Sequence, residues 1–271
     1  MTNKLEQIKT SEWWSPNGGF FGVDYRRGDD SVCGYLPSQA LSLEERTKRE
    51  ARGVMHFLNL NPGASILDAP CGYGRHSLAL AAMGFRMIGV DINPEFLTTA
   101  QKKSSQDLTV DFRKGDIRYL ECIKDSSVDA VINMFLSFGF FEKESDNLLV
   151  LESFKRVLQP HGKLLIHTDL TTEILDNGSY RMSEERTLNS GGTLRIEEIF
   201  ESESRQLCGT WTIENEAHIT TLTPYRVRIY STDEYTAILK LAGFANIQFF
   251  GSFEAVPFQA SSEELIIVAT K

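Results

Sequence analysis

The chain has few cysteines, and no two of them are close together in the sequence. The four cysteines, Cys33, Cys71, Cys122 and Cys208, are far apart, and none belongs to a CxxC motif. This spacing excludes a zinc knuckle and a CxxC redox centre, and we expect no metal site. Reduced, mostly buried thiols are typical of cytosolic proteins, so the cysteine pattern predicts a cytoplasmic location.

Long runs of positive charge and of apolar residues are also missing. Lysine and arginine total 28 against 37 aspartates and glutamates, so the formal net charge is −9. An acidic protein repels the phosphates of nucleic acids and of anionic membranes, which argues against both partners. Residues 1–10 lack the apolar core of a signal peptide, and the apolar stretch 129–141 is too short to span a bilayer.

The chain does have enough apolar sequence for one large core. It is 271 residues long and 41% of them are apolar, which suits one α/β domain with appended segments. From Ser42 onward, short apolar runs alternate with helical patterns of about ten residues, as in βαβ units. Strands are expected at 65–67, 85–90, 110–114, 129–135 and 163–168, and helices at 42–60, 75–83, 94–103 and 145–158. The fold class is therefore α/β, with a doubly wound, mostly parallel sheet.

Two regions depart from this alternation. Residues 1–41 are rich in aromatic rings, glycine and proline, and we expect them to form a lid segment. After the fifth strand, alternating runs at 193–200, 209–215 and 225–230 predict an antiparallel β insertion over about residues 171–230 that covers the substrate. A helix at 232–242 and two strands, the last pair antiparallel, then complete a sheet of about seven strands, so the main domain is expected to cover residues 42–271.

The strongest chemical signal is the run Ile66-Leu67-Asp68-Ala69-Pro70-Cys71-Gly72-Tyr73-Gly74, where the first strand turns into a helix. Gly72 and Gly74 let the backbone approach a ligand closely, and the helix behind them offers free N–H groups. Asp68 adds a carboxylate at the strand end. A ligand that carries both a cationic amine and a carboxylate suits this combination.

Three further signals follow at the ends of later strands. Asp91 closes Ile88-Gly89-Val90-Asp91, a position where an acidic side chain commonly binds both ribose hydroxyls of a nucleoside. Asp116-Ile117 comes after the third strand, and an aspartate beside an apolar side chain suits the amino group and ring face of adenine. Asn133-Met134 comes at the fourth strand's end, near the switch point where open α/β sheets bind ligands. Together these positions predict a nucleoside site.

The four signals, in this order, resemble those of the class I S-adenosylmethionine-dependent methyltransferases over about residues 42–169. The stretches CGYGRHSLALA, SFGFF, RVLQPHGKLLI and ELIIVATK are similar to those of bacterial small-molecule methyltransferases. The resemblance implies a Rossmann-like fold and S-adenosyl-L-methionine as cofactor. Pro70 stands where that family usually has glycine, so we expect altered rigidity of the turn.

The resemblance also implies a role for each signal. Asp68, Gly72 and Gly74 would hold the methionine moiety, and Asp91 the ribose. Asp116 and Ile117 would hold the adenine, and the backbone of Asn133 would approach the sulfonium. The full set of expected cofactor-binding residues is Tyr25, Tyr35, Asp68, Pro70, Cys71, Gly72, Gly74, Asp91, Ile92, Asp116, Ile117, Asn133 and Met134.

The implied reaction is in-line attack of a small-molecule acceptor on the S-methyl group, through an amine, a hydroxyl or a carbanion. A base is needed only where the acceptor must lose a proton, and the candidates are His167 on the fifth strand and Tyr25. A core or capping role for His167 stays open. Tyr25 and Tyr35 either face the sulfonium cation or only seal the sheet edge. Arg226, Arg228 and Tyr230, on one face of a strand, either bind an anionic part of the acceptor or form a solvated strand face.

Two other functions stay open. The chain is either an enzyme or a catalytically silent scaffold that binds the cofactor. A nicotinamide-dependent Rossmann enzyme is the further alternative, because Gly72-x-Gly74-x-x-Ser77 is one small-residue change from GxGxxG. Asp68 argues against it, since a carboxylate at that strand end would repel a pyrophosphate. A homodimer formed through the insertion also stays open.

Overall fold

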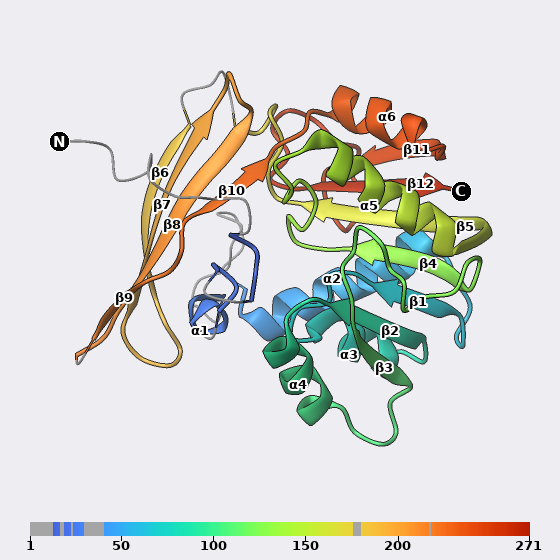
Figure 1. The fold of residues 1–271 in the computed structure, drawn as a ribbon, viewed down its shortest axis with the longest axis horizontal. Helices are drawn as coiled ribbons and strands as arrows, with labels where there is room; N and C mark the ends of the chain where they lie inside the picture. Colours follow the sequence, from blue (N-terminus) through green and yellow to red (C-terminus); the bar gives the residue numbers. More distant parts are fainter. Residues whose placement is uncertain (1–12, 17–18, 23, 30–40, 176–179, 217) are drawn as a thin grey trace.

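A computed structural model describes residues 13–16, 19–22, 24–29, 41–175, 180–216 and 218–271 (Figure 1). Cys33 and Tyr35 lie outside the described residues, and Tyr35 is one of the expected cofactor-binding residues. Among the described helices, none is long and apolar enough to cross a membrane.

The larger layer is a seven-stranded sheet in the order β11-β12-β5-β4-β1-β2-β3 (Figure 1). Only β12 is reversed, since it runs antiparallel to both of its neighbours while β1 to β5 pair in parallel. The predicted α/β fold with a mostly parallel seven-stranded sheet is thereby confirmed. The strands are β1 (Ser65–Asp68), β2 (Arg86–Asp91), β3 (Val110–Lys114), β4 (Val128–Asn133), β5 (Leu158–Thr168), β11 (Ala245–Phe250) and β12 (Leu265–Thr270).

Helices cover both faces of this sheet. One face packs against α5 (Glu144–Val157) and α6 (Thr232–Leu241), through a core that includes Phe154 and Leu239. The opposite face packs against α2 (Leu43–Leu58) and α3 (Arg75–Ala82), while α4 (Pro94–Lys103) lies against β2 and β3. Burial of these apolar stripes fixes the sheet between two helical layers, with the carboxyl ends of the parallel strands along one edge.

The insertion forms a second sheet beside that edge (Figure 1). Its order is β10-β8-β7-β6, with β9 paired to β8, and every pair is antiparallel. The strands are β6 (Arg181–Thr187), β7 (Thr193–Glu201), β8 (Gln206–Glu214), β9 (Ile219–Thr221) and β10 (Tyr225–Arg228). The antiparallel insertion is as predicted, but β6 was not expected because its sequence RMSEERT is mostly polar and exposed.

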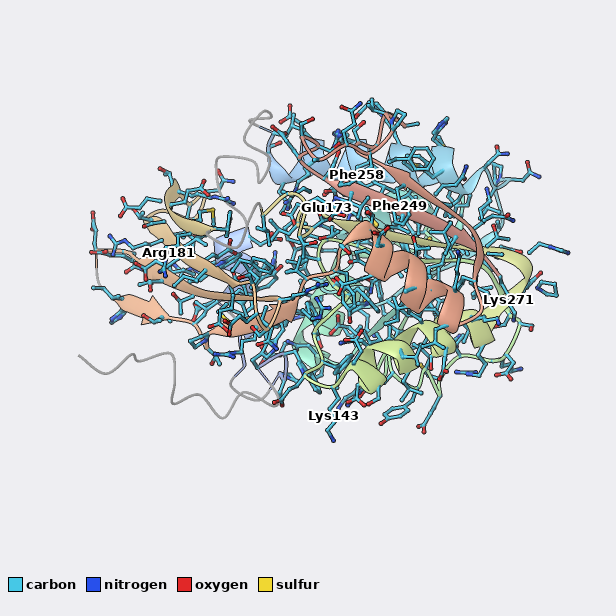
Figure 2. All side chains as sticks on the ribbon, turned by 90° about the horizontal axis from the view of Figure 1, so that it is seen from above. Lys143, Glu173, Arg181, Phe249, Phe258 and Lys271 are labelled. Carbon is cyan, nitrogen blue, oxygen red and sulfur yellow. The ribbon has the colours of Figure 1, made fainter. Side chains whose placement is uncertain are left out.

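The carboxylate of Glu173 links the segment that leads into the insertion with the segment that follows it. Oε1 of Glu173 accepts hydrogen bonds from the backbone N–H of Thr232 (3.0 Å) and from its Oγ1 hydroxyl (2.8 Å). Figure 2 shows Glu173 between Arg181, on the insertion side, and Lys271, at the opposite end of the molecule. Ser231 then caps α6 with a reciprocal capping box, so the chain re-enters the main domain at a fixed point.

The N-terminal segment packs between the two sheets. Its short helix α1 (Tyr25–Asp29) lies beside the inner face of the insertion (Figure 1). The Phe20 ring centroid is 5.1 Å from that of Trp211, and Tyr25 stacks on Trp211 at 5.4 Å with 17° between the planes. A Cβ at Gly28 would lie 2.6 Å from the Trp211 ring, so only glycine permits this close packing.

Candidate active site

A cavity of about 760 Å³ lies where the main sheet, the N-terminal segment and the insertion meet. One wall comes from the loops after the parallel strands, and it includes Gly72, Asp91 and Ile117. The opposite wall comes from the insertion, and aromatic rings of the N-terminal segment close the space between them. Ligands of open α/β sheets bind at this edge, so the fold places the cavity where a ligand is expected.

The turn after β1 forms where the sequence predicts it, but of its two glycines only Gly72 lines the cavity. Gly72 and Gly74 have φ of 53° and 80°, values that L side chains rarely adopt. A Cβ at Gly72 would meet no atom within 4 Å, whereas one at Gly74 would lie 2.8 Å from Phe112 and Ala100. Gly72 therefore leaves open space beside the cavity, and Gly74 allows the turn to pack against its neighbours without lining the cavity itself.

Arg75 was missed by the sequence analysis. It begins α3, lines the cavity, and donates from Nη1 to Glu50 and to Oγ1 of Thr47 (3.2 Å). Its Nη2 is buried without a hydrogen-bond partner among the described residues. A guanidinium next to uncapped N–H groups of a helix start is suited to a carboxylate. The signal in the sequence is the position of Arg75 directly after Gly74, where a cation can pair with the carboxylate expected of the ligand.

Asp91 lies at the end of β2 and lines the cavity with Ile92. Its Oδ2 accepts from the Gly72 N–H (2.8 Å) and its Oδ1 from the Asn93 N–H (2.8 Å). Burial raises the pKa of this carboxyl to about 6. The two backbone donors fix the orientation of the carboxylate, and each oxygen keeps a lone pair for a ribose hydroxyl.

Asp68 and Asn133 stand behind the cavity wall and do not line it. Oδ2 of Asp68 accepts from the Ser77 hydroxyl (2.6 Å), Oδ1 has no partner among the described residues, and burial raises the pKa of the carboxyl to about 7. The Asn133 amide donates to the carbonyls of Ala69 (2.9 Å) and Ser137 (3.3 Å). Both side chains therefore hold the loops that form the wall.

The remaining expected residues of the cofactor side do line the cavity. They are Pro70, Cys71, Asp116, Ile117 and Met134. The Asp116 carboxylate is held by Arg118, whose Nη2 is 2.7 Å from Oδ2. Burial raises the pKa of the Cys71 thiol, which keeps it protonated. This side of the cavity thus combines apolar surfaces with carboxylates whose orientation is fixed.

The two candidate bases differ in position. Tyr25 lines the cavity, but burial raises the pKa of its hydroxyl well above its usual value, so it suits a hydrogen-bond donor and not a base. His167 does not line the cavity. Its Nδ1 accepts from the Phe135 N–H (3.3 Å), and its Nε2 lies 3.3 Å from Oε2 of Glu264 without a well-aligned hydrogen bond. This geometry favours the core role for His167.

The anion-binding role of Arg226 and Arg228 is wrong, because neither side chain lines the cavity. Arg228 is paired with Glu234 (2.6 Å), and Arg226 donates to Gln206 (3.2 Å). Alternation places Tyr225 and Val227 on the cavity side of the same strand. This side of the cavity also carries polar residues that the sequence does not single out: Asp169, which follows β5, and Tyr180, Glu184, Arg186 and Glu198 on the insertion.

Comparison with known proteins agrees with this geometry. Residues 66–162 match the family described as "Methyltransferase domain". Over 209 residues the chain is 27% identical to the "Putative methyltransferase YqeM" of Bacillus subtilis (strain 168), covering 76% of this chain and 83% of that one.

Two solved structures share the fold. The CcbJ methyltransferase of Streptomyces caelestis superimposes with a TM-score of 0.72 at 16% identity, over 90% of this chain and 97% of that one. CalS10 of Micromonospora echinaspora, described as an amino pentose methyltransferase with bound SAM, gives a TM-score of 0.64 at 20% identity, over 85% of this chain and 92% of that one.

Proposed function

We propose that this chain is a class I S-adenosylmethionine-dependent methyltransferase whose acceptor is a small molecule held between the glycine turn and the insertion. The observation that carries the proposal is the cavity of about 760 Å³, whose two walls differ in chemistry. A nicotinamide enzyme and a silent scaffold are not favoured, because the matched family and the related proteins are methyltransferases.

The residues of the main-sheet wall fit S-adenosylmethionine. Arg75 and the start of α3 would hold its carboxylate, and Asp91 would accept hydrogen bonds from the ribose hydroxyls. Ile92, Asp116 and Ile117 would surround the adenine. When bound, S-adenosylmethionine supplies an electrophilic methyl group on a sulfonium, so the protein needs no nucleophile of its own.

The chain's own contribution is to orient the acceptor and exclude water. Rings of the N-terminal segment and the insertion close the cavity, and Tyr25 keeps a protonated hydroxyl that can donate to the acceptor. Holding two reactants in line supplies much of the acceleration of such a transfer, and a dry site protects the methyl donor. We include in the proposal that residues 1–41 act as a lid on the main domain (42–271).

Other parts of the proposal concern context. The acidic composition and the absence of basic runs support a small-molecule partner over a nucleic acid, and the unpaired cysteines support a cytoplasmic location. A homodimer formed through the insertion would be detected by light scattering of the full chain. The name of one structural relative specifies an amino pentose, which supports a nitrogen acceptor without defining it.

The test begins with binding of S-adenosylhomocysteine, the product of the reaction, measured by calorimetry on the full chain. We expect affinity in the micromolar range, and we expect Arg75→Gln to weaken it by about 1.5–3 kcal/mol, the scale of a hydrogen bond to a charged group. Arg86→Gln is the matched control, because Arg86 is exposed at the far end of β2.

The second step uses labelled S-adenosylmethionine and a cell extract that is separated into macromolecules and small molecules after the reaction. Label in the small-molecule fraction supports the proposal. Label confined to protein or nucleic acid, or wild-type chain that binds neither cofactor nor product, contradicts it.

A further inference from the structure

A carboxylate stands where the insertion should be apolar. Along β7, the side chains of Leu194, Ile196 and Phe200 are buried in the insertion's core, and Glu198 occupies the same alternating face. Glu198 is half-buried and lines the cavity. A charge in this apolar row is costly unless something satisfies it, so its position calls for a functional explanation.

The neighbouring strands hold Glu198 in place. It lies directly across from Gly209 on β8, which in turn lies across from Tyr225 on β10. A Cβ at Gly209 would collide with the Tyr225 ring, so the glycine lets this ring extend over β8. The Tyr225 hydroxyl donates to Oε1 of Glu198, and the Tyr180 hydroxyl donates to Oε2 (3.1 Å).

A second carboxylate lies nearby. Asp169 follows β5 and lines the cavity, and its Oδ1 is buried without a hydrogen-bond partner among the described residues. Both carboxylates line the same cavity. Burial raises the pKa of both, His167 lowers that of Asp169, and the charge of Asp169 further raises the pKa of Glu198. A cation placed beside them would relieve both the repulsion and the poor solvation.

No described lysine lines the cavity to supply that cation. The arginine on this side, Arg186, forms a two-pronged pair with Glu184, with Nε to Oε1 and Nη2 to Oε2 both at 2.8 Å. Arg186 also lowers the pKa of Glu198, but one arginine beside Glu184, Asp169 and Glu198 leaves this side of the cavity with an excess of negative charge. An anionic acceptor would be repelled from it.

Aromatic rings complete the surroundings. Phe20 lies edge-on to Tyr225 at 4.7 Å between centroids, and Trp13 lies edge-on to Phe140 at 5.0 Å. All four rings line the cavity together with Tyr25 and Trp211. Aromatic faces attract ammonium groups, and carboxylates beside them add a directional partner.

We propose that the acceptor is an amine, bound as its ammonium form beside Asp169 and Glu198 within this aromatic wall, and that Asp169 receives its proton. The inference rests on the proposed function and narrows its substrate class to amines. Glu198 is a binding residue because both of its oxygens already accept a tyrosine hydroxyl, whereas Asp169 keeps an oxygen to spare.

The atoms balance in this assignment. The ammonium loses one proton to the Asp169 carboxylate, and the freed nitrogen lone pair forms the new bond to the methyl carbon. The carbon–sulfur bond breaks, its electron pair stays on sulfur, and the product is a methylated ammonium. An alcohol acceptor with Asp169 as general base is the alternative that the test must separate.

The test uses benzylamine and benzyl alcohol, two probes of nearly equal shape that differ in charge. Binding to the full chain saturated with S-adenosylhomocysteine is followed by tryptophan fluorescence, since Trp13 and Trp211 line the cavity. We expect benzylamine, a cation at neutral pH, to bind about tenfold more tightly than benzyl alcohol, the change that one charge-assisted contact gives. Asp169→Asn and Glu198→Gln should each remove most of this preference.

The matched control is Glu197→Gln, because Glu197 is exposed on the opposite face of the same strand. It should keep the wild-type preference. Affinity for S-adenosylhomocysteine, measured first, verifies that each variant is folded, and its absence in the wild type would contradict the proposed function instead. With that affinity intact, equal binding of the two probes, tighter binding of the alcohol, or no binding of either overturns the amine proposal.

Discussion

Asp68 and Asp91 are the same residue type at the ends of adjacent strands, yet their surroundings differ. Two backbone N–H groups orient the carboxylate of Asp91, which lines the cavity. Asp68 is bonded to a side chain of α3 and stands behind the wall. The sequence predicts both positions but not this difference, because it depends on how α3 packs over the strand ends. We therefore expect ligand contact from Asp91 and support of the turn from Asp68.

The titration of Asp91 leads to a prediction at the residue scale. Because burial raises its pKa to about 6, the carboxylate that accepts ribose hydroxyls is lost at a higher pH than for an exposed aspartate. Affinity for S-adenosylhomocysteine should therefore be constant at about pH 8 and fall as the pH drops through about 6, approaching tenfold for each further pH unit. Calorimetry across this range measures the effect.

Two variants isolate the responsible group. Asp91→Asn should bind more weakly by about 1–3 kcal/mol at high pH and should lose the pH dependence near 6. Asp68→Asn is the comparison, since Asp68 titrates at about 7 behind the wall and its removal should leave the fall near 6 in place. An affinity that does not change with pH in the wild type would show that the charge of Asp91 does not contribute to binding.

At the scale of elements, Glu198, Gly209 and Tyr225 lie side by side across three strands of the insertion. We expect the stability of the insertion to depend on how this row packs. Gly209→Ala would place a methyl group against the Tyr225 ring and push it away from Glu198. Overpacking of this kind costs about 1–3 kcal/mol, so we expect a lower free energy of unfolding in urea. Affinity for S-adenosylhomocysteine should stay near wild type, because Arg75 and Asp91 lie on the other wall.

Gly22→Ala is the control for this substitution. A Cβ at Gly22 would be 3.6 Å from its nearest neighbour, an ordinary contact, so its effect should stay within about 0.5 kcal/mol. If Gly209→Ala were equally harmless, Tyr225 would have room to spare, and its hydrogen bond to Glu198 would not depend on the glycine.

Helices and strands with a clear apolar pattern can be predicted from the sequence, whereas mostly polar strands cannot. The strands β1, β2, β4 and β5 can be predicted because burial on both faces leaves a clear apolar run. β6 was missed because its side chains are mostly exposed and charged. His167 was placed on the correct strand, but its contacts with Phe135 and Glu264 join residues far apart in sequence, which no local pattern reveals.

In the candidate site, Glu198 can be found from the sequence, but its contacts cannot. It interrupts an apolar alternation that the sequence analysis recognised as a strand, and a charged residue on the covered face is itself a signal. The residues that interact with Glu198 cannot be read from the sequence, because Tyr180, Tyr225 and Asp169 come from three other segments. The cofactor wall was predictable from one continuous region, whereas the acceptor wall required the fold.

At the scale of the whole molecule, the cavity lies where three parts of the chain contact one another: the main domain, the N-terminal segment and the insertion. The N-terminal segment is bonded to the cofactor loops, since Asn93 donates to the Phe21 carbonyl (2.7 Å) and the Tyr73 hydroxyl donates to Asp29. The same segment packs its rings on Trp211 of the insertion. A ligand that orders the cofactor loops should therefore also stabilise the N-terminal segment, and through it the insertion.

Hydrogen–deuterium exchange with and without S-adenosylhomocysteine tests this coupling. We expect slower exchange in residues 70–76 and 91–97, which include the loops beside the ligand, and also in 19–22, 24–29 and 207–213, which do not belong to the main sheet. Strands β5 and β12 are paired on both sides within the sheet and should exchange too slowly to be detected with or without ligand over minutes to hours, because buried interior strands open only in rare global unfolding. Asp91→Ala at the same ligand concentration should show reduced protection throughout. Protection confined to the two loops would mean that the N-terminal segment and the insertion do not respond to the cofactor, and it would contradict their role as a cover.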